Sequence, residues 1–431
     1  MKSRGHLLLA VLLCLCLACG ASQLQEEKVI CDYRGWSDPI LQQDSTALLL
    51  GPSVVVHERS AYQVGNTSFL LRPEGPNGYL IQQIGGASEL YTDAHYAGAG
   101  YSTVVVADKK GGLHLLWGEP PDSTATTNRM AEVTTLYYSH YSEGNWSTRE
   151  QVYHYPPGFS WGGYLLKHFV VDDEDNLHLA FTNYNTWERA GTIQYLRKDQ
   201  EGWHVRDTEL EAGEGFIEVG PDGEILLTYI AAQLPENAKR GDSDQNSIFF
   251  TVSTDDGITW AEPVLVNRSG RQPGNAPRIV LAPDETIHVL WFKALEGQWR
   301  SQVIWHANSN DGGQTWSEPA EIGTGLGGHL TMFQAVATQD GCIHMVIERE
   351  GGIVAMDQQL YYSQWDGNRW SQPERPFPDT YSLQFGMTAS DDGNVHLTWT
   401  QRPSAAWPSR AAALPGPGEW PRQAYSINRP R

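Results

Sequence analysis

Arginine and glutamate side chains recur in the segments that separate the apolar stretches of this sequence. Arg189, Arg300, Arg349 and Arg402 are examples, and Glu348 precedes Arg349 directly. A guanidinium binds a carboxylate through two parallel hydrogen bonds, so arginines that converge would recognise an acidic ligand. The alternative is that each charge is simply solvated on its own loop. These residue types therefore indicate an anion-binding site only where the fold brings them together.

The histidines fall into two groups. Five occupy the same place in the related phrases "LHLLW", "LHLAF", "IHVLW", "IHMVI" and "VHLTW", namely His114, His178, His288, His344 and His396. Because a catalytic residue is not needed five times, we expect these five to pack in the core or to bond to turns. His168 and His329 lie outside that position and remain binding candidates. A histidine near a tyrosine can abstract a proton, as a uronate lyase requires.

Two acidic stretches share the pattern S-x-D-x-G-x-T-W, "STDDGITW" at 253–260 and "SNDGGQTW" at 309–316. In each, an aspartate can accept backbone N–H groups, a glycine can adopt positive φ, and a tryptophan can pack against a sheet. These residues are Asp255, Gly257, Trp260, Asp311, Gly313 and Trp316. Neither stretch has the ligand spacing of a calcium loop, and beyond residues 1–21 no C-x-x-C or H-x₃-H spacing indicates zinc. We predict structural turns, and neither a metal nor a cofactor.

A longer phrase, an apolar run, an Asp/Gly turn and an alternating run, recurs along the chain. Its six copies lie at 104–117, 169–181, 217–229, 279–291, 335–347 and 386–399. Each copy predicts a β-hairpin, and a second pair of strands follows most copies. Four-stranded antiparallel sheets of this size must stack on their neighbours, and radial stacking produces a propeller.

The predicted fold class is therefore all-β, a six-bladed β-propeller of four-stranded antiparallel blades. We expect one propeller domain over 45–431 and an N-terminal strap over 22–44. The sixth copy lacks its outer strand. Apolar segments at 53–58, 68–73 and 79–84 are the candidates to complete it and close the ring.

The S-x-D-x-G-x-T-W motif resembles the Asp box, or BNR repeat, of the sialidase-like six-bladed β-propellers. The turns "SEGNW", "DQEGW" and "WDGNRW" resemble degenerate copies, so the resemblance spans nearly the whole chain after its N-terminal segment. In such propellers the Asp boxes lie on the edge opposite the ligand site. The resemblance therefore implies a site among the connections from second to third strands and from one repeat to the next.

Sialidases of this family hold the substrate carboxylate with three arginines, and use a Tyr–Glu pair as nucleophile and an Asp as acid/base. The resemblance implies Tyr381, Glu348 and Asp93 for the catalytic roles. Substrate binding would fall to Arg278, Arg189, Arg300, Arg349 and Arg402, with His168 and His329.

The family motif F/Y-R-I-P, which carries the first arginine, is absent. Its nearest counterpart is "APRIVLAPDETIHVLW" at 276–291, where Arg278 opens a strand of the fourth repeat. An exo-sialidase-like hydrolase acting on terminal acidic sugars is therefore one hypothesis. A non-catalytic glycan- or protein-binding propeller, a uronate lyase and a purely structural scaffold remain alternatives.

The charge balance is strongly acidic, with 51 Asp and Glu against 30 Lys and Arg and a net charge of −21. Such a chain repels nucleic acid and anionic membranes, so neither is expected as a partner. A glycan or another anionic small ligand is the expected partner. We expect a monomer.

The N-terminus predicts export. Lys2 and Arg4 precede an apolar run at 7–18 that is too short to span a bilayer, so residues 1–21 read as a signal peptide. Simple cleavage and lipidation at Cys19 are both compatible with the residues that follow, which places the protein outside the cytoplasm, secreted or anchored as a lipoprotein. Beyond the signal, Cys31 and Cys342 either form a disulfide or remain two thiols.

Overall fold

The computed structural model describes the following residues. They are 25–33, 39–41, 54–56, 60–64, 67–73, 79–84, 103–108, 110, 112–119, 135–142, 145–155, 169–185, 190–212, 214–232, 246–267, 274–295, 298–323, 326, 330–350, 358–375, 381–389, 395–402 and 422–428. For the strands before residue 103 and after residue 395, the structure describes the backbone course and the strand pairing, and almost no side chains.

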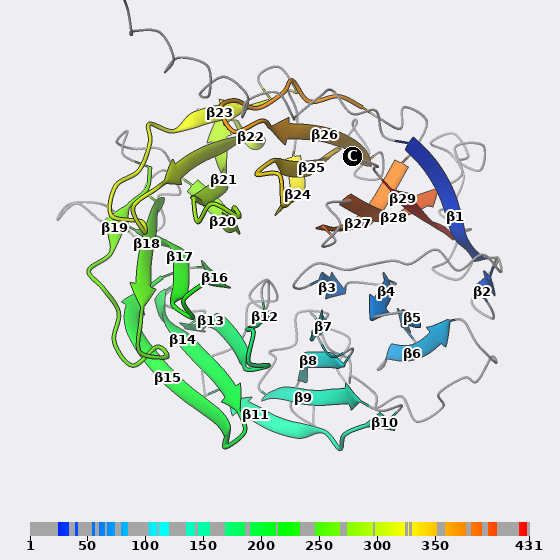
Figure 1. Ribbon diagram of the computed structural model, residues 1–431, viewed down its shortest axis with the longest axis horizontal. Coiled ribbons are helices and arrows are strands. Elements are labelled where there is room, and N and C mark those ends of the chain that lie inside the picture. Colours follow the sequence, from blue (N-terminus) through cyan, green and yellow to red (C-terminus); the bar gives the residue numbers. More distant parts are fainter. Residues whose placement is uncertain are drawn as a thin grey trace, which may run out of the picture.

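Three consecutive repeats form separate four-stranded antiparallel sheets (Figure 1). The first contains β12 (Phe169–Val171), β13 (Leu177–Asn185), β14 (Ala190–Asp199) and β15 (Gly202–Glu211). The second contains β16 (Glu214–Val219), β17 (Ile225–Ala232), β18 (Asn246–Ser253) and β19 (Val264–Leu265). The third contains β20 (Gly274–Leu281), β21 (Ile287–Leu295), β22 (Gln298–Ser309) and β23 (Ala320–Ile322). Each sheet runs in chain order, as the repeated hairpins predict.

The sheet that precedes them has the same centre and a more complex outer edge. It contains β7 (Thr103–Ala107), β8 (Leu113–Glu119) and β9 (Thr135–Ser142), with β10 (Asn145–Trp146) and β11 (Glu150–His154) both paired to β9. A short strand, β3 (Val54–Val56), pairs with the free edge of β7.

The last two repeats are joined into one continuous sheet. They contain β24 (Leu330–Ala337), β25 (Ile343–Glu350), β26 (Gln358–Trp365), β27 (Tyr381–Ala389), β28 (Val395–Arg402) and β29 (Arg422–Asn428). A single pair, Gln358 with Ser382, links β26 to β27. The backbone N–H of Met387 also donates to Oε1 of Gln334 at 2.7 Å, which ties β27 to β24.

The N-terminal segment closes this sheet differently from the sequence expectation. β1 (Gln25–Tyr33), which lies within the expected strap, pairs antiparallel with β29, and β2 (Pro39–Leu41) pairs with β1. β4 (Ser60–Val64), β5 (Thr67–Pro73) and β6 (Tyr79–Ile84) pair with one another instead of completing the sixth copy. Among the described strands, the ring in Figure 1 therefore holds the sheets of the six repeats and this further three-stranded sheet.

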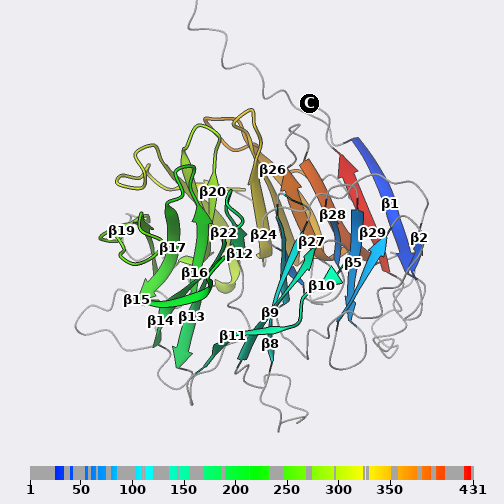
Figure 2. The same cartoon turned by 60° about the horizontal axis from the view of Figure 1, so that its bottom comes forward.

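The all-β propeller architecture is confirmed. In the repeats whose side chains are described, alternate side chains along the second strand fill the spaces between neighbouring sheets, as period-2 alternation requires. On β13, Leu177, Leu179 and Phe181 are buried together with Val106 and Leu116 of the preceding sheet. From β7 to β26, where side chains are described, neighbouring sheets therefore bury their facing sides against one another, as layers around the ring (Figure 2).

Aromatic side chains also link each sheet to the next. Tyr195 on β14 meets Trp260 edge-on with ring centroids 5.9 Å apart. Phe250 on β18 meets Trp316 in the same way at 5.2 Å. The tryptophan that ends each S-x-D-x-G-x-T-W turn thus covers the third-strand aromatic of the preceding sheet, which gives the motif a packing role between repeats.

Two edges of the ring can now be distinguished. The turn edge carries the turns between first and second strands and between third and fourth strands, including both S-x-D-x-G-x-T-W stretches. The loop edge carries the other connections.

Among the described residues, no helix is long and apolar enough to cross a bilayer. Cys342 is disulfide-bonded, so it is not a free thiol. Its pairing with Cys31 stays a prediction.

Candidate functional site

The polar groups of the S-x-D-x-G-x-T-W stretches form hydrogen bonds within their own turns. Oδ1 of Asp311 accepts the Thr315 N–H at 2.8 Å and the Ser309 hydroxyl at 2.7 Å, and Oδ2 accepts the Thr315 hydroxyl at 2.5 Å. These hydrogen bonds, those from Thr315 first, lower the pKa of Asp311 to about 2. Gly313 has a φ of 87° and lies directly against the Phe250 ring. These are the contacts expected of turn residues, so Asp311 and Gly313 have a structural role.

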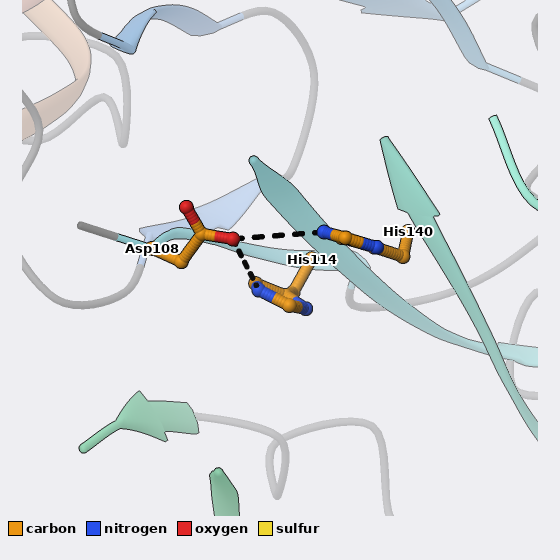
Figure 3. A group of neighbouring side chains, drawn as sticks. All are labelled: Asp108, His114 and His140. Atoms are coloured by element: carbon orange, nitrogen blue, oxygen red, sulfur yellow. Dashed lines mark hydrogen bonds and ion pairs between the residues drawn. The ribbon is translucent and has the colours of Figure 1, made fainter. Parts of the chain in front are cut away.

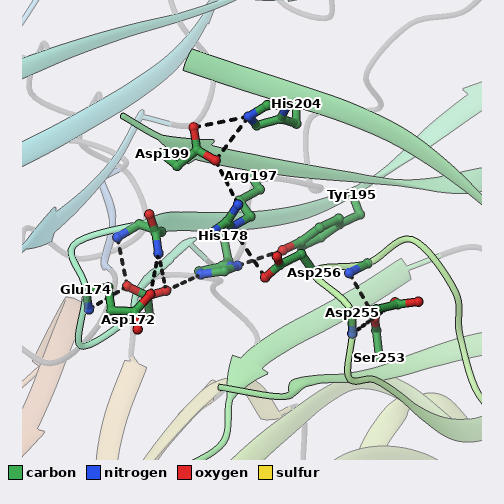
Figure 4. A network of polar contacts seen from close by, with 12 residues as sticks. Asp172, Glu174, His178, Tyr195, Arg197, Asp199, His204, Ser253, Asp255 and Asp256 are labelled. Atoms are coloured by element: carbon green, nitrogen blue, oxygen red, sulfur yellow. Dashed lines mark hydrogen bonds and ion pairs between the residues drawn. The ribbon is translucent and has the colours of Figure 1, made fainter. Parts of the chain in front are cut away.

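The repeated histidines form buried hydrogen-bonded networks on the same edge. His178 lies between Tyr195, whose hydroxyl is 2.7 Å from Nδ1, and Asp172, whose Oδ2 is 3.1 Å from Nε2 (Figure 4). Asp172 begins the turn that joins β12 to β13, and its Oδ1 accepts the Asn176 N–H at 2.8 Å. The network therefore links a turn, the second strand and the third strand of one sheet.

Other repeats build the same network with substitutions. His344 is 2.7 Å from the Tyr362 hydroxyl and 3.1 Å from the Thr338 hydroxyl. His288 meets His306 at 2.8 Å, and burial lowers the pKa of His288 to about 4. The expectation that these histidines bond to turns and pack in the core is confirmed where their side chains are described. His396 lies on β28, outside the described side chains.

The loop edge of the joined sheet gathers four of the sequence candidates. Tyr381 begins β27 and is the direct cross-strand partner of Arg402 at the end of β28. Glu348 and Arg349 lie at the end of β25, opposite Leu360 and Gln359 at the start of β26. Since Gln358 pairs with both Glu350 and Ser382, these strand ends share one edge of a continuous sheet.

Glu348 and Arg349 lie on strand β25 and not in a loop as the sequence suggested, because the alternating pattern runs on through "IERE". They therefore point to opposite faces. Ile347, on the same face as Arg349, packs with Leu290 and Phe292 of the preceding sheet. Glu348, which is 2% exposed, faces the other way, toward the β27–β28 strands.

Arg349 is held by a neighbour and retains free donors. Its Nη1 donates to the Tyr361 hydroxyl at 3.0 Å, and Tyr361 donates in turn to Gln359 Oε1 at 3.2 Å. Its buried Nε has no hydrogen-bond partner among the described residues. Tyr361 and Gln359 were not singled out from the sequence. Only the strand register, which places the start of β26 opposite Arg349, shows that these two residues belong to the site.

The remaining candidates do not join this group. Arg278 lies on β20, where its guanidinium stacks on the Phe216 ring at 4.8 Å and donates to the Pro277 carbonyl at 3.0 Å. Arg300 lies on β22, in a different sheet from Arg349. Among the candidate arginines, Arg278 and Arg349 are the two whose side chains are described, and these two do not converge as a carboxylate clamp. Asp93, Arg189, His168 and His329 lie outside the described residues.

Comparison with known proteins identifies the architecture. Residues 223–409 match the family model for a BNR repeat-like domain. Over this segment the chain is similar to BNR-repeat proteins, in agreement with the resemblance of its S-x-D-x-G-x-T-W turns. No curated protein matches the chain at the sequence level.

The solved structures that are similar to this chain have low sequence identity to it. Polysaccharide lyase Uly1 is 12% identical, covers 94% of this chain and 99% of its own, and has a TM-score of 0.50. A protein of unknown function from Dyadobacter fermentans is 15% identical, covers 76% and 93%, and has a TM-score of 0.49. The α-L-arabinofuranosidase Arb93A from Fusarium graminearum is 12% identical, covers 75% and 91%, and has a TM-score of 0.44. At these identities the likeness concerns the fold.

Proposed function

We propose that this propeller is an exported protein that binds an acidic sugar at the loop edge of β25–β28 and cleaves the glycan there. The observation that carries the proposal is the cross-strand pairing of Tyr381 with Arg402, with Glu348 facing the same strands. The polysaccharide lyase Uly1, which has the same fold along almost its whole length, agrees with this assignment. Export rests on the N-terminal signal pattern of residues 1–21.

The reaction that needs the fewest groups is elimination at a uronate. Tyr381 and Arg402 are directly paired, and residues paired in this way have Cβ atoms about 4.5–5.5 Å apart, so we assign the phenol and the guanidinium of this pair to one sugar. The guanidinium would neutralise the carboxylate and favour the phenolate form of the tyrosine. The phenolate would take the proton from the carbon beside the carboxylate, a carbon–carbon double bond would form as the carbon–oxygen bond to the leaving sugar breaks, and the resulting tyrosine hydroxyl would return the proton to the departing glycosidic oxygen.

Hydrolysis of a sialoside is the second candidate. It is favoured by Glu348, which is buried on the face of β25 toward the strand that begins with Tyr381. In that scheme Tyr381 is the nucleophile, Glu348 assists it and Asp93 is the acid/base. The stacking of Arg278 on Phe216, away from Arg349 and Tyr361, weighs against the three-arginine clamp that this reaction uses.

One experiment separates these reactions. The purified chain is incubated with uronate polysaccharides and with a fluorogenic sialoside, and the ultraviolet absorbance of an unsaturated product and the released fluorophore are followed. We expect absorbance without fluorophore release, abolished by Tyr381→Phe and reduced by at least about 100-fold by Arg402→Lys, since both contact the substrate. The sialoside reaction alone would support the second candidate.

A matched control uses the opposite edge. Arg369 is exposed on the turn edge beside Asp366, so Arg369→Ala should leave the reaction unchanged. The proposed site would be overturned if the chain produced neither the unsaturated product nor the fluorophore but bound to a glycan array, and if Arg402→Lys did not weaken that binding. This outcome would favour a non-catalytic binding propeller.

A further inference from the structure

A cluster of three metal-ligating side chains lies on the turn edge of the β7–β11 sheet, away from the candidate sugar site. Asp108 follows β7, His114 lies on β8, and His140 lies on β9 (Figure 3). One ligating atom from each lies within 4.8 Å of those of the other two. Asp108 and His114 belong to a network that the next repeat also contains, in Asp172 and His178. His140 does not.

The distances suit a tetrahedral ion. Oδ2 of Asp108 is 3.2 Å from Nε2 of His114 and 3.6 Å from Nε2 of His140. A tetrahedral zinc ion with ligands at about 2.0–2.2 Å requires ligand atoms about 3.3–3.5 Å apart. The two imidazoles stack with centroids 4.4 Å apart, so binding one ion requires the rings to tilt about χ2, which is a soft torsion, until both lone pairs point at it.

Neighbouring groups already orient two of the three side chains, Asp108 and His114. Oδ1 of Asp108 accepts N–H groups from Gly112 at 2.6 Å and Lys110 at 2.9 Å, which leaves Oδ2 to face the imidazoles. The Tyr138 hydroxyl lies 2.8 Å from Nδ1 of His114. Metal-bound histidines are held in this way through their other ring nitrogen.

His140 is the residue that points to a ligand. Its Nε2 is buried and has no hydrogen-bond partner among the described residues, because 3.6 Å to Asp108 is too long. Its side chain is nevertheless 30% exposed, which leaves a path for an ion and a water.

Two positions distinguish this repeat from the others that the structure describes. The cross-strand partner of the repeated histidine is His140 here, but Arg197, Asn308 and Gln364 at the same register elsewhere. The residue four places after the start of the β7–β8 turn is Gly112 here, where the next repeat has Asn176. A Cβ on Gly112 would come within 2.3 Å of Asp108 Oδ2 and 2.6 Å of His140 Nε2.

We propose that Asp108, His114 and His140 bind a divalent transition-metal ion, with zinc the best fit to two imidazoles and one carboxylate. The three side chains supply three of four tetrahedral positions, and water occupies the fourth. The ion joins the β7–β8 turn to the third strand of the sheet, so it stabilises the fold at this edge. This inference does not depend on the proposed reaction.

Zinc content measures the site directly. The full chain, prepared without a histidine tag, is stripped with a chelator, equilibrated with buffered zinc and analysed for bound metal. We expect one zinc per chain. His140→Asn should weaken binding by more than about 100-fold, since loss of an outer-shell partner alone costs about 10–100-fold. Asn308 occupies the matching position in another repeat, so asparagine is compatible with the sheet.

Two further variants keep the test decisive. Gln364→Asn changes the matching position of a repeat without this cluster and should leave zinc binding unchanged. Gly112→Ala retains all three ligands but fills the space between them, and should weaken binding by at least about 10-fold. No zinc in the unmodified chain at micromolar free metal, or equal zinc in His140→Asn, would overturn the proposal.

Discussion

The β7–β11 sheet and the β12–β15 sheet are built on the same plan, yet only one carries a candidate metal site. Both join a turn aspartate, a second-strand histidine and a third-strand tyrosine, Asp108–His114–Tyr138 and Asp172–His178–Tyr195. They differ at the cross-strand partner of the histidine. In one it is His140, which faces the carboxylate, and in the other it is Arg197, which bonds to Asp199 at 2.8 Å.

The difference shows how a structural network can become a binding site. The shared network satisfies its own polar groups, so it requires no ligand in the β12–β15 sheet. Replacing an arginine by a histidine removes a fixed positive charge and adds a lone pair beside the same carboxylate. Gly112 in place of Asn176 then leaves room for an ion.

The largest expected effect comes from breaking the shared network. His178→Leu leaves the buried Tyr195 hydroxyl and Asp172 without their partner, so we expect the free energy of unfolding to fall by about 3 kcal/mol. Urea unfolding measures this. Adding Tyr195→Phe should recover about 1 kcal/mol, because the third repeat carries Leu226 at the same place and Phe250 on its third strand. A loss below about 1 kcal/mol would show that the network is not structural.

The next largest effect comes from transferring the metal site. Arg197→His together with Asn176→Gly gives the β12–β15 sheet the two features that distinguish its neighbour. We expect a second zinc per chain, and a stabilisation of about 2.7 kcal/mol at free zinc 100 times the dissociation constant. Metal analysis and thermal unfolding with and without zinc measure both. If the double variant still holds one zinc, then the two positions do not account for the difference between the sheets.

A pH effect of about 2 kcal/mol tests the carboxylate of the shared network. Burial raises the pKa of Asp172, but hydrogen bonds from His178 and Asn176 outweigh it and lower the pKa from 3.8 to about 2. A carboxyl with a lower pKa in the folded state stabilises the fold above its unfolded pKa, and this contribution of about 2 kcal/mol is lost as pH falls from about 4 to 2. Relative to the unmodified chain, Asp172→Asn should therefore lose stability at pH 6 and little at pH 2. Parallel curves for the two proteins would contradict the shift.

The smallest effect concerns the residue that replaces His140. Arg197 bonds to Asp199 and lies 3.6 Å from Asp256, whose side chain is 53% exposed. Pairs near solvent contribute little, so Arg197→Met should change the free energy of unfolding by less than about 1 kcal/mol, and less again in high salt. Chemical unfolding at two salt concentrations measures this. A larger, salt-independent loss would mean that Arg197 is as structural as His178.

Much of the fold was predictable because its signals are local. The repeated phrase around His178 predicted a hairpin, and residues 169–185 form β12 and β13. The turn chemistry of Asp311 and Gly313 was also readable from adjacent residues. The N-terminal strands were not assigned correctly, because the pairing of β1 with β29 joins opposite ends of the chain and leaves no mark on neighbouring residues.

The two candidate sites were less predictable for the same reason. Tyr381, Arg402, Glu348 and Arg349 were chosen from residue type and resemblance, but their shared edge depends on the pairing of Gln358 with Ser382. The metal cluster was not predicted at all. His140 lies 26 residues after His114, with no ligand spacing between them to recognise.

By itself, the sequence determined the repeated hairpins, the turns that close them and the buried histidines, because each depends on residues a few positions apart. The tertiary structure alone decided which strand ends share an edge and which side chain faces His114 across the sheet. Those neighbours are set by strand register between distant segments. A change of one residue in register would turn His140 to the other face and remove the site.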